Sequence, residues 1–247
     1  MVALSLIAVV VVVATCGLGS YLLVKDGSTV VGAEPAPIPT IPRRDISSRT
    51  ADPALLTIAD VFPGDEITVD PSIPPYKRIG AAQAAKDCRV AATSDLGKLL
   101  VTLGCNQVVR ATYSSTEGAF LVTAGVFNLV DSASATKANT DIKVLVDGAK
   151  GRFSGYVSGT PAKMLGRSST RLAWAAEGHF LIFSVIARAD GKEFADEDEA
   201  HIKVIVYDIL DKHLRDGMIG NWSIDKSTPK PSAGPSGPSA GPSGSAG

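Results

Sequence analysis

The sequence contains few of the residues that build metal or catalytic sites. Its 247 residues include three cysteines and three histidines, and no histidine pair has the H-E-x-x-H spacing of a zinc protease. Between residues 54 and 220 it also lacks a G-x-S-x-G nucleophile elbow and a glycine-rich phosphate loop. We therefore expect no metal, no cofactor and no catalytic residue, and the sequence favours a protein that is not an enzyme.

An excess of charge of either sign is also missing. Lys and Arg together number 24 and Asp and Glu 25, so that the formal net charge is -1. Proteins that bind nucleic acid carry basic patches, because contacts to phosphate supply much of the affinity. The overall balance therefore predicts no nucleic-acid partner.

A long apolar run is present at the N-terminus. Residues 3–24 contain no charged side chain, and about 22 residues at a rise of 1.5 Å form a helix of roughly 33 Å, enough to cross a bilayer core. We predict a transmembrane anchor over residues 1–25, with the membrane as its partner. A cleaved signal peptide is one alternative, although no basic residue precedes the run. A lipidated Cys16 is another.

Two signals disagree about the side of the membrane on which the rest of the chain lies. The basic residue nearest the run is Lys25, on its C-terminal side, and the positive-inside rule alone would place the domain in the cytoplasm. A Pro-rich neck and a pair of cysteines suit an oxidising compartment outside. We expect a single-pass protein of the cell membrane with an extracytoplasmic domain, and a basic cytoplasmic leader that this sequence lacks.

Composition divides the remaining chain into three parts. Residues 26–53 are rich in Pro, Gly, Ala and Ser and include EPAPIPTIP, which predicts an extended linker. Residues 221–247 repeat PSAGPSG units with few apolar side chains, which predicts a disordered tail. Residues 54–220 are expected to form one domain around one hydrophobic core.

Hydrophobic periodicity in that domain alternates between helical and strand spacing. The expected elements are a helix over 94–103, strands over 107–114 and 119–130, a helix over 133–146, strands over 152–159, 171–176 and 179–189, and a helix with a capping box at Asp196 and Glu199. Turns are expected at Gly118 and Gly178. This α-β-β-α-β-β-β-α order predicts an α+β fold, in which an antiparallel sheet is packed by helices on one face.

Four segments of the domain resemble one group of proteins. They are GCNQVVRATY, FLVTAGVFNLVD, KGRFSG and GHFLIFSVIARADG. Together they resemble uncharacterised membrane-anchored proteins of actinobacteria that have one extracytoplasmic domain, over roughly residues 55–216 of this chain. The resemblance implies an origin and a localisation, and it implies no activity and no catalytic residue.

Cys88 and Cys105 flank the first predicted helix of the domain. We expect a disulfide between them in an exported domain, and closing a loop of that size stabilises a fold by about 3 kcal/mol. Two reduced core thiols are the alternative if the domain faces the cytoplasm. A redox pair is a further alternative, although the spacing is far from C-x-x-C.

The three histidines do not form a metal site by their spacing. His179 begins an apolar strand, where a core or strand-end histidine is expected. His201 and His213 lie too far apart along one predicted helix to share a metal. The acidic group at 196–199 opens that helix, where we expect it to stabilise the positive end of the helix dipole rather than to bind a cation.

One set of polar and aromatic side chains is the candidate surface for a ligand or partner. It consists of Arg110, Thr112, Tyr113, Arg171, Trp174 and His179. If their strands are neighbours, arginine and aromatic groups would share one surface. The alternative is an ordinary solvated sheet face with the tryptophan in the core.

These observations favour a membrane-anchored extracytoplasmic module of the cell envelope. It would bind a ligand, an envelope protein or a cell-wall partner, or have a structural role. One alternative is an envelope hydrolase whose site includes His179 with an acidic partner or Ser184. The other is a subunit of a larger membrane complex, which would expose a large apolar patch.

Overall fold

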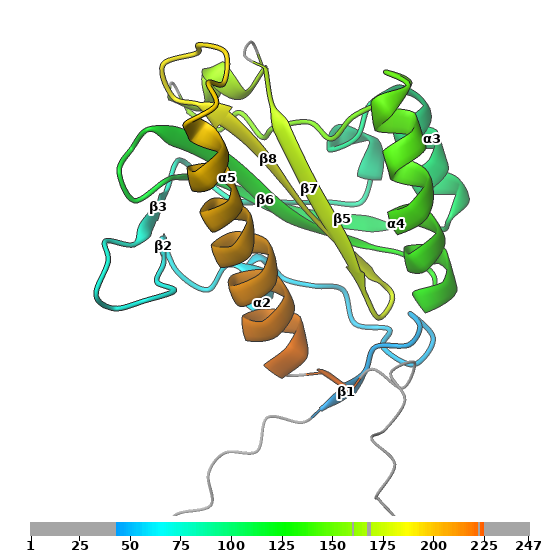
Figure 1. Ribbon diagram of the computed structural model, residues 1–247. Coiled ribbons are helices and arrows are strands. Elements are labelled where there is room, and N and C mark those ends of the chain that lie inside the picture. Colours follow the sequence, from blue (N-terminus) through cyan, green and yellow to red (C-terminus); the bar gives the residue numbers. More distant parts are fainter. Residues whose placement is uncertain (1–42, 160, 167–168, 222, 225–247) are drawn as a thin grey trace, which may run out of the picture. The chain divides into compact units, whose positions relative to one another are not determined.

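The described part of the chain begins at Arg43. The computed structural model describes residues 43–159, 161–166, 169–221 and 223–224 (Figure 1). The predicted anchor at residues 1–25 and the predicted tail beyond residue 224 lie outside the described residues. Among the described residues, no helix has both the length and the apolar composition that crossing a bilayer requires.

A seven-stranded antiparallel sheet forms the centre of the domain, which confirms the predicted α+β class. The strands are β2 (Glu66–Ile67), β3 (Tyr76–Arg78), β4 (Gln83–Ala85), β5 (Gln107–Ser114), β6 (Phe120–Asn128), β7 (Arg171–Glu177) and β8 (Phe180–Arg188). Their order is β2-β3-β5-β6-β8-β7, and β4 also pairs with β5. The β5–β6 and β7–β8 hairpins turn at Gly118 and Gly178, as predicted, and meet where β6 pairs with β8.

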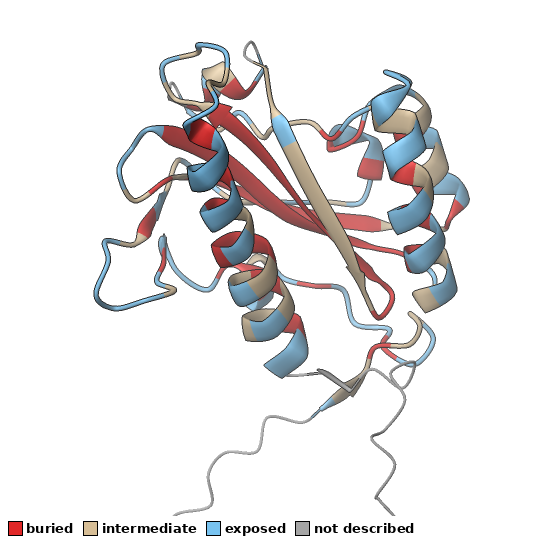
Figure 2. Ribbon diagram, in the orientation of Figure 1, coloured by how far each residue is buried: buried red, intermediate tan, exposed pale blue. Residues whose placement is uncertain are grey.

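Successive side chains of the central strands point to opposite faces of this sheet, and both faces are apolar and buried. In β6, Val122 and Ala124 belong to one hydrophobic cluster and Leu121 and Phe127 to the other. The same alternation runs through β8. Figure 2 shows β6 buried throughout and β8 buried up to Arg188, with β7 only partly covered. A sheet that is apolar on both faces needs a cover on each of them.

Helices supply these covers on opposite faces. They are α2 (Ile58–Val61), α3 (Ser94–Thr102), α4 (Ser132–Asp147), α5 (Asp198–Val206) and the π-helix η3 (Tyr207–Gly220), with short 3-10 turns η1 (Cys88–Val90) and η2 (Pro161–Gly166). α3 and α4 pack on one face, and α2, α5 and η3 on the other (Figure 1). The expectation of helices on one face is therefore wrong, because it overlooked the second apolar face of the strands.

Residues 152–159, which we call the strap, were expected to be a strand and are not. Apart from an isolated bridge between Ala92 and Phe153, the strap joins no ladder of the sheet. Side chains take the place of a neighbouring strand: Tyr156 donates its N–H to the Thr123 hydroxyl at 2.9 Å, and its carbonyl accepts the Thr112 hydroxyl at 2.6 Å. The strap therefore crosses the face of β5 and β6 instead of lying beside them.

The folded unit extends beyond both predicted boundaries. Residues 43–53 were assigned to the linker, yet Ile46 is fully buried and accepts a backbone hydrogen bond from His179 at 2.8 Å. β1 (Arg44–Asp45) pairs in parallel with β9 (Ser223–Ile224), which was assigned to the tail. The buried Ile46 and hydrogen bonds such as that from the Arg49 N–H to the Val130 carbonyl hold this segment, and its average composition does not reveal them.

The last helix begins differently from the predicted capping box. Neither Asp196 nor Glu199 caps it; α5 starts at Asp198, whose carboxylate accepts the N–H of Ala195 at 2.8 Å. Arg188 also holds Asp198, with N–O distances of 2.7 and 2.8 Å. The acidic group does stand at the helix start as expected, but one of its members connects the helix to β8.

Candidate functional site

The six residues of the predicted ligand surface do not come together. β5 and β7 are separated by β6 and β8, so that Arg110 and Trp174 lie on strands that are not neighbours. Along β7, Arg171 faces α5, where it pairs with Glu199, while Trp174 faces α4 and donates to the carbonyl of Asn139 at 3.0 Å. The predicted surface is therefore wrong, because it requires a strand order that the fold does not have.

Arg110 and Thr112 hold the strap. Arg110 donates to Gln83 Oε1 at 2.8 Å and to the carbonyl of Ser154 at 3.3 Å, and its guanidinium lies 4.7 Å from the centre of the Tyr156 ring. Burial lowers the pKa of the Arg110 guanidinium. Thr112 is fully buried between β5 and the strap. Both side chains are engaged in the fold and offer no surface to a ligand.

Tyr113 and His179 are also buried in the core. Tyr113 is fully buried on the sheet face opposite Thr112, where its ring lies 5.8 Å from that of Phe62. The His179 Nδ1–H donates to the carbonyl of Ile46 at 2.9 Å, and the imidazole is fully buried. Burial lowers the pKa of His179, so that it stays neutral in the folded protein. The expected core histidine is confirmed.

The predicted disulfide is present. Cys88 and Cys105 are bonded with their Cα atoms 6.3 Å apart. The bond connects η1 to the segment that leads into β5, and it closes a loop that contains α3. It is placed to hold α3 against the sheet.

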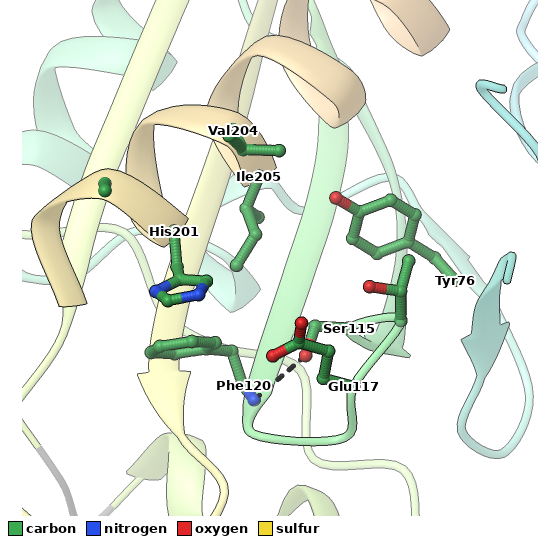
Figure 3. Close-up of a pocket in the computed structure, with 9 residues that line it drawn as sticks. Tyr76, Ser115, Glu117, Phe120, His201, Val204 and Ile205 are labelled. Carbon is green, nitrogen blue, oxygen red and sulfur yellow. Dashed lines mark hydrogen bonds between the residues drawn. The ribbon is translucent and has the colours of Figure 1, made fainter. Parts of the chain in front are cut away.

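A cleft at one end of the sheet is the strongest candidate for a binding site. We call it the α5 cleft; it has a volume of about 270 Å³ and lies between the turn of the β5–β6 hairpin and one side of α5. Its lining consists of Tyr76, Ser115, Thr116, Glu117, Phe120, Ala200, His201, Val204 and Ile205. Figure 3 shows Glu117 and His201 pointing into the same space, with Phe120 below the imidazole.

Aromatic contacts and hydrogen bonds fix the floor of the α5 cleft. The rings of Phe120 and His201 have centres 6.1 Å apart, and Phe120 stacks on Phe194 at 6.4 Å. Ser115 Oγ accepts the N–H of Phe120 at 3.1 Å, which closes the hairpin turn (Figure 3). The imidazole therefore rests on a preformed apolar floor.

Tyr76 closes the inner end of the cleft. Its hydroxyl donates to Asp208 Oδ2 at 2.7 Å, and both residues are buried. Burial, together with the hydrogen bond and negative charge of Asp208, raises the pKa of Tyr76 well above its usual value. Tyr76 is therefore a neutral phenol that forms a wall of the cleft rather than an acid or base at neutral pH.

The α5 cleft has a mixed polar and apolar lining. It combines a carboxylate, an imidazole and hydroxyl groups with an apolar floor, a combination typical of small-ligand sites. No hydrogen bond joins Ser115 to His201 in the part of the chain that the structure describes, and that part also has no cluster of three potential metal-ligating side chains. Within these bounds the residues do not assemble a nucleophile with its base.

Sequence reasoning considered the members of this cleft only separately. His201 was considered only as a metal ligand, and Glu117 lies next to the turn predicted at Gly118. They are far apart in the sequence, and no local motif connects them. Comparisons of the chain with models of protein families, with curated proteins and with solved structures found no match.

Proposed function

We propose that the protein is a membrane-anchored extracytoplasmic binding module of the cell envelope and that the α5 cleft is its binding site. The anchor rests on the uncharged run at residues 3–24, and the resemblance to actinobacterial membrane proteins supports the same location. The observation that supports the binding role is that Glu117 and His201 line the same cleft, with His201 above the ring of Phe120. The candidate arginines and His179 are engaged in internal contacts instead.

The size and charge of the cleft define the class of ligand. A cavity of about 270 Å³ is slightly smaller than the pockets that hold drug-sized molecules, which begin at about 300 Å³. It suits a small amphipathic molecule, or one or two side chains of a partner. The Glu117 carboxylate would pair with a cationic or hydrogen-bond-donating group, and Phe120 would contact the apolar body of the ligand.

An envelope hydrolase with a site at His179 is not supported. A general base must reach the proton that it abstracts, directly or through one water. His179 is fully buried, and its Nδ1 is bonded to the Ile46 carbonyl. Ser184 is fully buried as well. The role of a subunit in a larger membrane complex is still an alternative proposal, favoured by the exposed Val101 on α3 and Val144 on α4.

The location is tested by labelling Cys88 and Cys105 in intact cells with a membrane-impermeant maleimide, with and without prior reduction. Labelling that requires reduction but not lysis is expected for a disulfide-bonded domain outside the membrane. Labelling that requires lysis but not reduction would place the domain in the cytoplasm and overturn this location. Mass mapping of the labelled peptides separates these cysteines from Cys16.

The binding site is tested by NMR titration of the protein with benzylamine, which combines an aromatic ring with an ammonium group. We expect shifts confined to amides of the β5–β6 turn and of α5, and Glu117→Gln should weaken the interaction roughly tenfold if the ion pair is partly desolvated. Glu197→Gln, an exposed acid outside the cleft lining, is the matched control. Shifts spread over the surface, or equal binding to Glu117→Gln, would contradict the proposal.

A further inference from the structure

The two edges of the central sheet differ in length. β2 at one edge has two residues, whereas β7 at the other has seven. On its outer side β7 pairs with no other strand among the described residues, and Figure 1 shows no element crossing it between α4 and α5. Natural edge strands are usually kept short or protected by Lys, Pro or a bulge. The β7 sequence RLAWAAE contains no Lys and no Pro.

The outward backbone groups of β7 follow from the register of its hairpin. Glu177 pairs with Phe180 across a two-residue turn. The two residues that flank such a turn form a hydrogen-bonded pair, in which the N–H of each bonds to the C=O of the other. Hydrogen-bonded positions then alternate along β7. Leu172, Trp174 and Ala176 consequently direct their N–H and C=O groups away from β8, toward solvent.

β7 is complementary to itself when a second copy runs antiparallel and both are centred on Trp174. Leu172 then lies opposite Ala176 of the other copy, so that all outward backbone groups can find partners. Arg171 lies opposite Glu177 of the other copy at both ends. Opposite residues share a face and have Cβ atoms about 5 Å apart, close enough for an arginine and a carboxylate to pair.

We propose that two copies of the chain associate through β7 to form one continuous antiparallel sheet, with Arg171 of each copy paired to Glu177 of the other. The opposite charges at the two ends of a strand with an uncharged centre favour a second copy over an unrelated peptide. Within one chain, Arg171 contacts Glu199 and Glu177 contacts Arg215 at 3.8 Å, so that each intermolecular pair extends an existing ion-pair network.

The helices leave room for this arrangement. α4 and η3 each contact both β7 and β8, so neither helix packs on the edge strand alone. With strands about 4.8 Å apart, two equivalent helices that each lie over the space between β7 and β8 would be separated by about 10 Å, the usual distance between packed helices. The covering helices would therefore meet at contact distance rather than collide.

The register is tested by cysteine cross-linking of the full chain in native membranes, in a Cys16→Ser background. Ala173→Cys and Ala175→Cys are introduced into two differently tagged chains that are expressed together. In the proposed pairing these positions are opposite, with Cα atoms about 4.5 Å apart, whereas two Ala173→Cys chains are about 8 Å apart and too distant for a disulfide. Oxidation should join the mixed pair and leave Ala173→Cys alone as monomer.

The charge pairing is tested by reversal in the same cross-linking assay. Arg171→Glu and Glu177→Arg should each reduce the mixed cross-link roughly tenfold, because like charges then face each other at both ends. The double variant should restore it. In that variant the new carboxylate at position 171 faces Glu199 and the new guanidinium at position 177 faces Arg215 within the same chain. The contacts within the chain are therefore not repaired, and a restored cross-link must come from pairing between the two chains.

Three results would overturn the proposal. The first is a mixed cross-link no stronger than that of Ala173→Cys alone. The second is a double charge variant whose mixed cross-link stays as weak as that of the single variants. The third is that both cysteine positions cross-link only to a different protein. A circular-dichroism melt of each purified full-length variant in detergent checks that the domain is folded. The restoration by the double variant also shows that the single reversals did not act by unfolding the domain.

Discussion

At the scale of single residues, the hydrogen bond between Tyr76 and Asp208 connects β3 to the last helix, η3. The two side chains are far apart in the sequence and both are buried. A buried carboxylate that loses its partner retains the full cost of desolvation. The stability of this contact therefore depends on the phenol hydroxyl, which also forms the inner wall of the α5 cleft.

Tyr76→Phe should lower the free energy of unfolding by about 1–3 kcal/mol, because it leaves the Asp208 carboxylate without this donor. Urea unfolding followed by circular dichroism measures the change. Tyr207→Phe is the matched control, since Tyr207 is exposed and its hydroxyl contributes little to the core. Equal stabilities of Tyr76→Phe and the unaltered protein would show that Asp208 finds another donor.

At the scale of elements, the strap is held to the sheet by threonine hydroxyls instead of a strand ladder. Thr123 Oγ1 accepts the N–H of Tyr156 and lies 2.9 Å from Thr112 Oγ1, which donates to the Tyr156 carbonyl. Two hydroxyls thus satisfy both backbone groups of one strap residue. The apolar packing of Phe153 against Phe127 and Phe183 holds the strap at its other end.

Thr123→Val should destabilise the domain by about 1–3 kcal/mol, because the buried N–H of Tyr156 loses its acceptor in a side chain of similar shape. Hydrogen exchange at the Tyr156 amide should speed up more than exchange in β8. Thr140→Val on the exposed surface of α4 is the control. Unchanged exchange at Tyr156 would mean that Thr123 does not hold the strap.

The disulfide acts on a second element, α3. Replacing Cys88 and Cys105 together by Ala should lower the free energy of unfolding by about 3 kcal/mol, because the unfolded chain regains the freedom of the closed loop. Urea unfolding with and without a reducing agent measures it. The reducing agent should lower the urea midpoint of the unaltered protein and should not change that of the double variant. An equal change in both proteins would contradict this account.

At the scale of the whole molecule, the fully buried His179 and the half-buried His213 make the stability of the fold depend on pH. Burial lowers the pKa of both His179 and His213 below the ordinary value of 6.5. His213 donates from Nε2 to the Val61 carbonyl at 3.1 Å, and His179 Nε2 has no hydrogen-bond partner among the described residues. Protonation would place a charge in each of these sites.

We expect the free energy of unfolding to fall as the pH drops below 6.5. In that range the unfolded chain binds protons that the folded one does not. The stability that each neutral histidine contributes is therefore complete above pH 6.5 and is lost as the pH falls toward its pKa in the folded protein. The loss is up to about 1.4 kcal/mol per pH unit for each histidine. Urea midpoints at pH 5.2, 6.5 and 8 measure the slope, at values chosen above the carboxylate range of about pH 4.

His213→Phe should reduce that slope by about half, since one of the two protonations is removed. A phenyl ring fits the site, because His213 stacks on Phe62 with ring centres 6.0 Å apart. A stability that is equal at pH 5.2 and pH 8 in the unaltered protein would show that neither histidine stays neutral in the fold.

Local patterns in the sequence determined much of this molecule. The spacing of Leu96 and Leu100 before Gly104 predicted α3, the glycines at 118 and 178 predicted both hairpin turns, and the disulfide was correctly paired. Turn glycines and helical periodicity act over a few residues, where the chain itself sets the geometry. These features could be inferred before any tertiary structure was known.

Only the tertiary structure decided the strand order, the role of the strap and the membership of the α5 cleft. Arg110 could belong to a surface or to the core, depending on whether its strand lies beside β7 or under the strap. Glu117 and His201 meet because β6 pairs with β8 and α5 folds back over the hairpin. Contacts between distant segments depend on the pairing of the whole sheet, and no short stretch of sequence specifies that pairing.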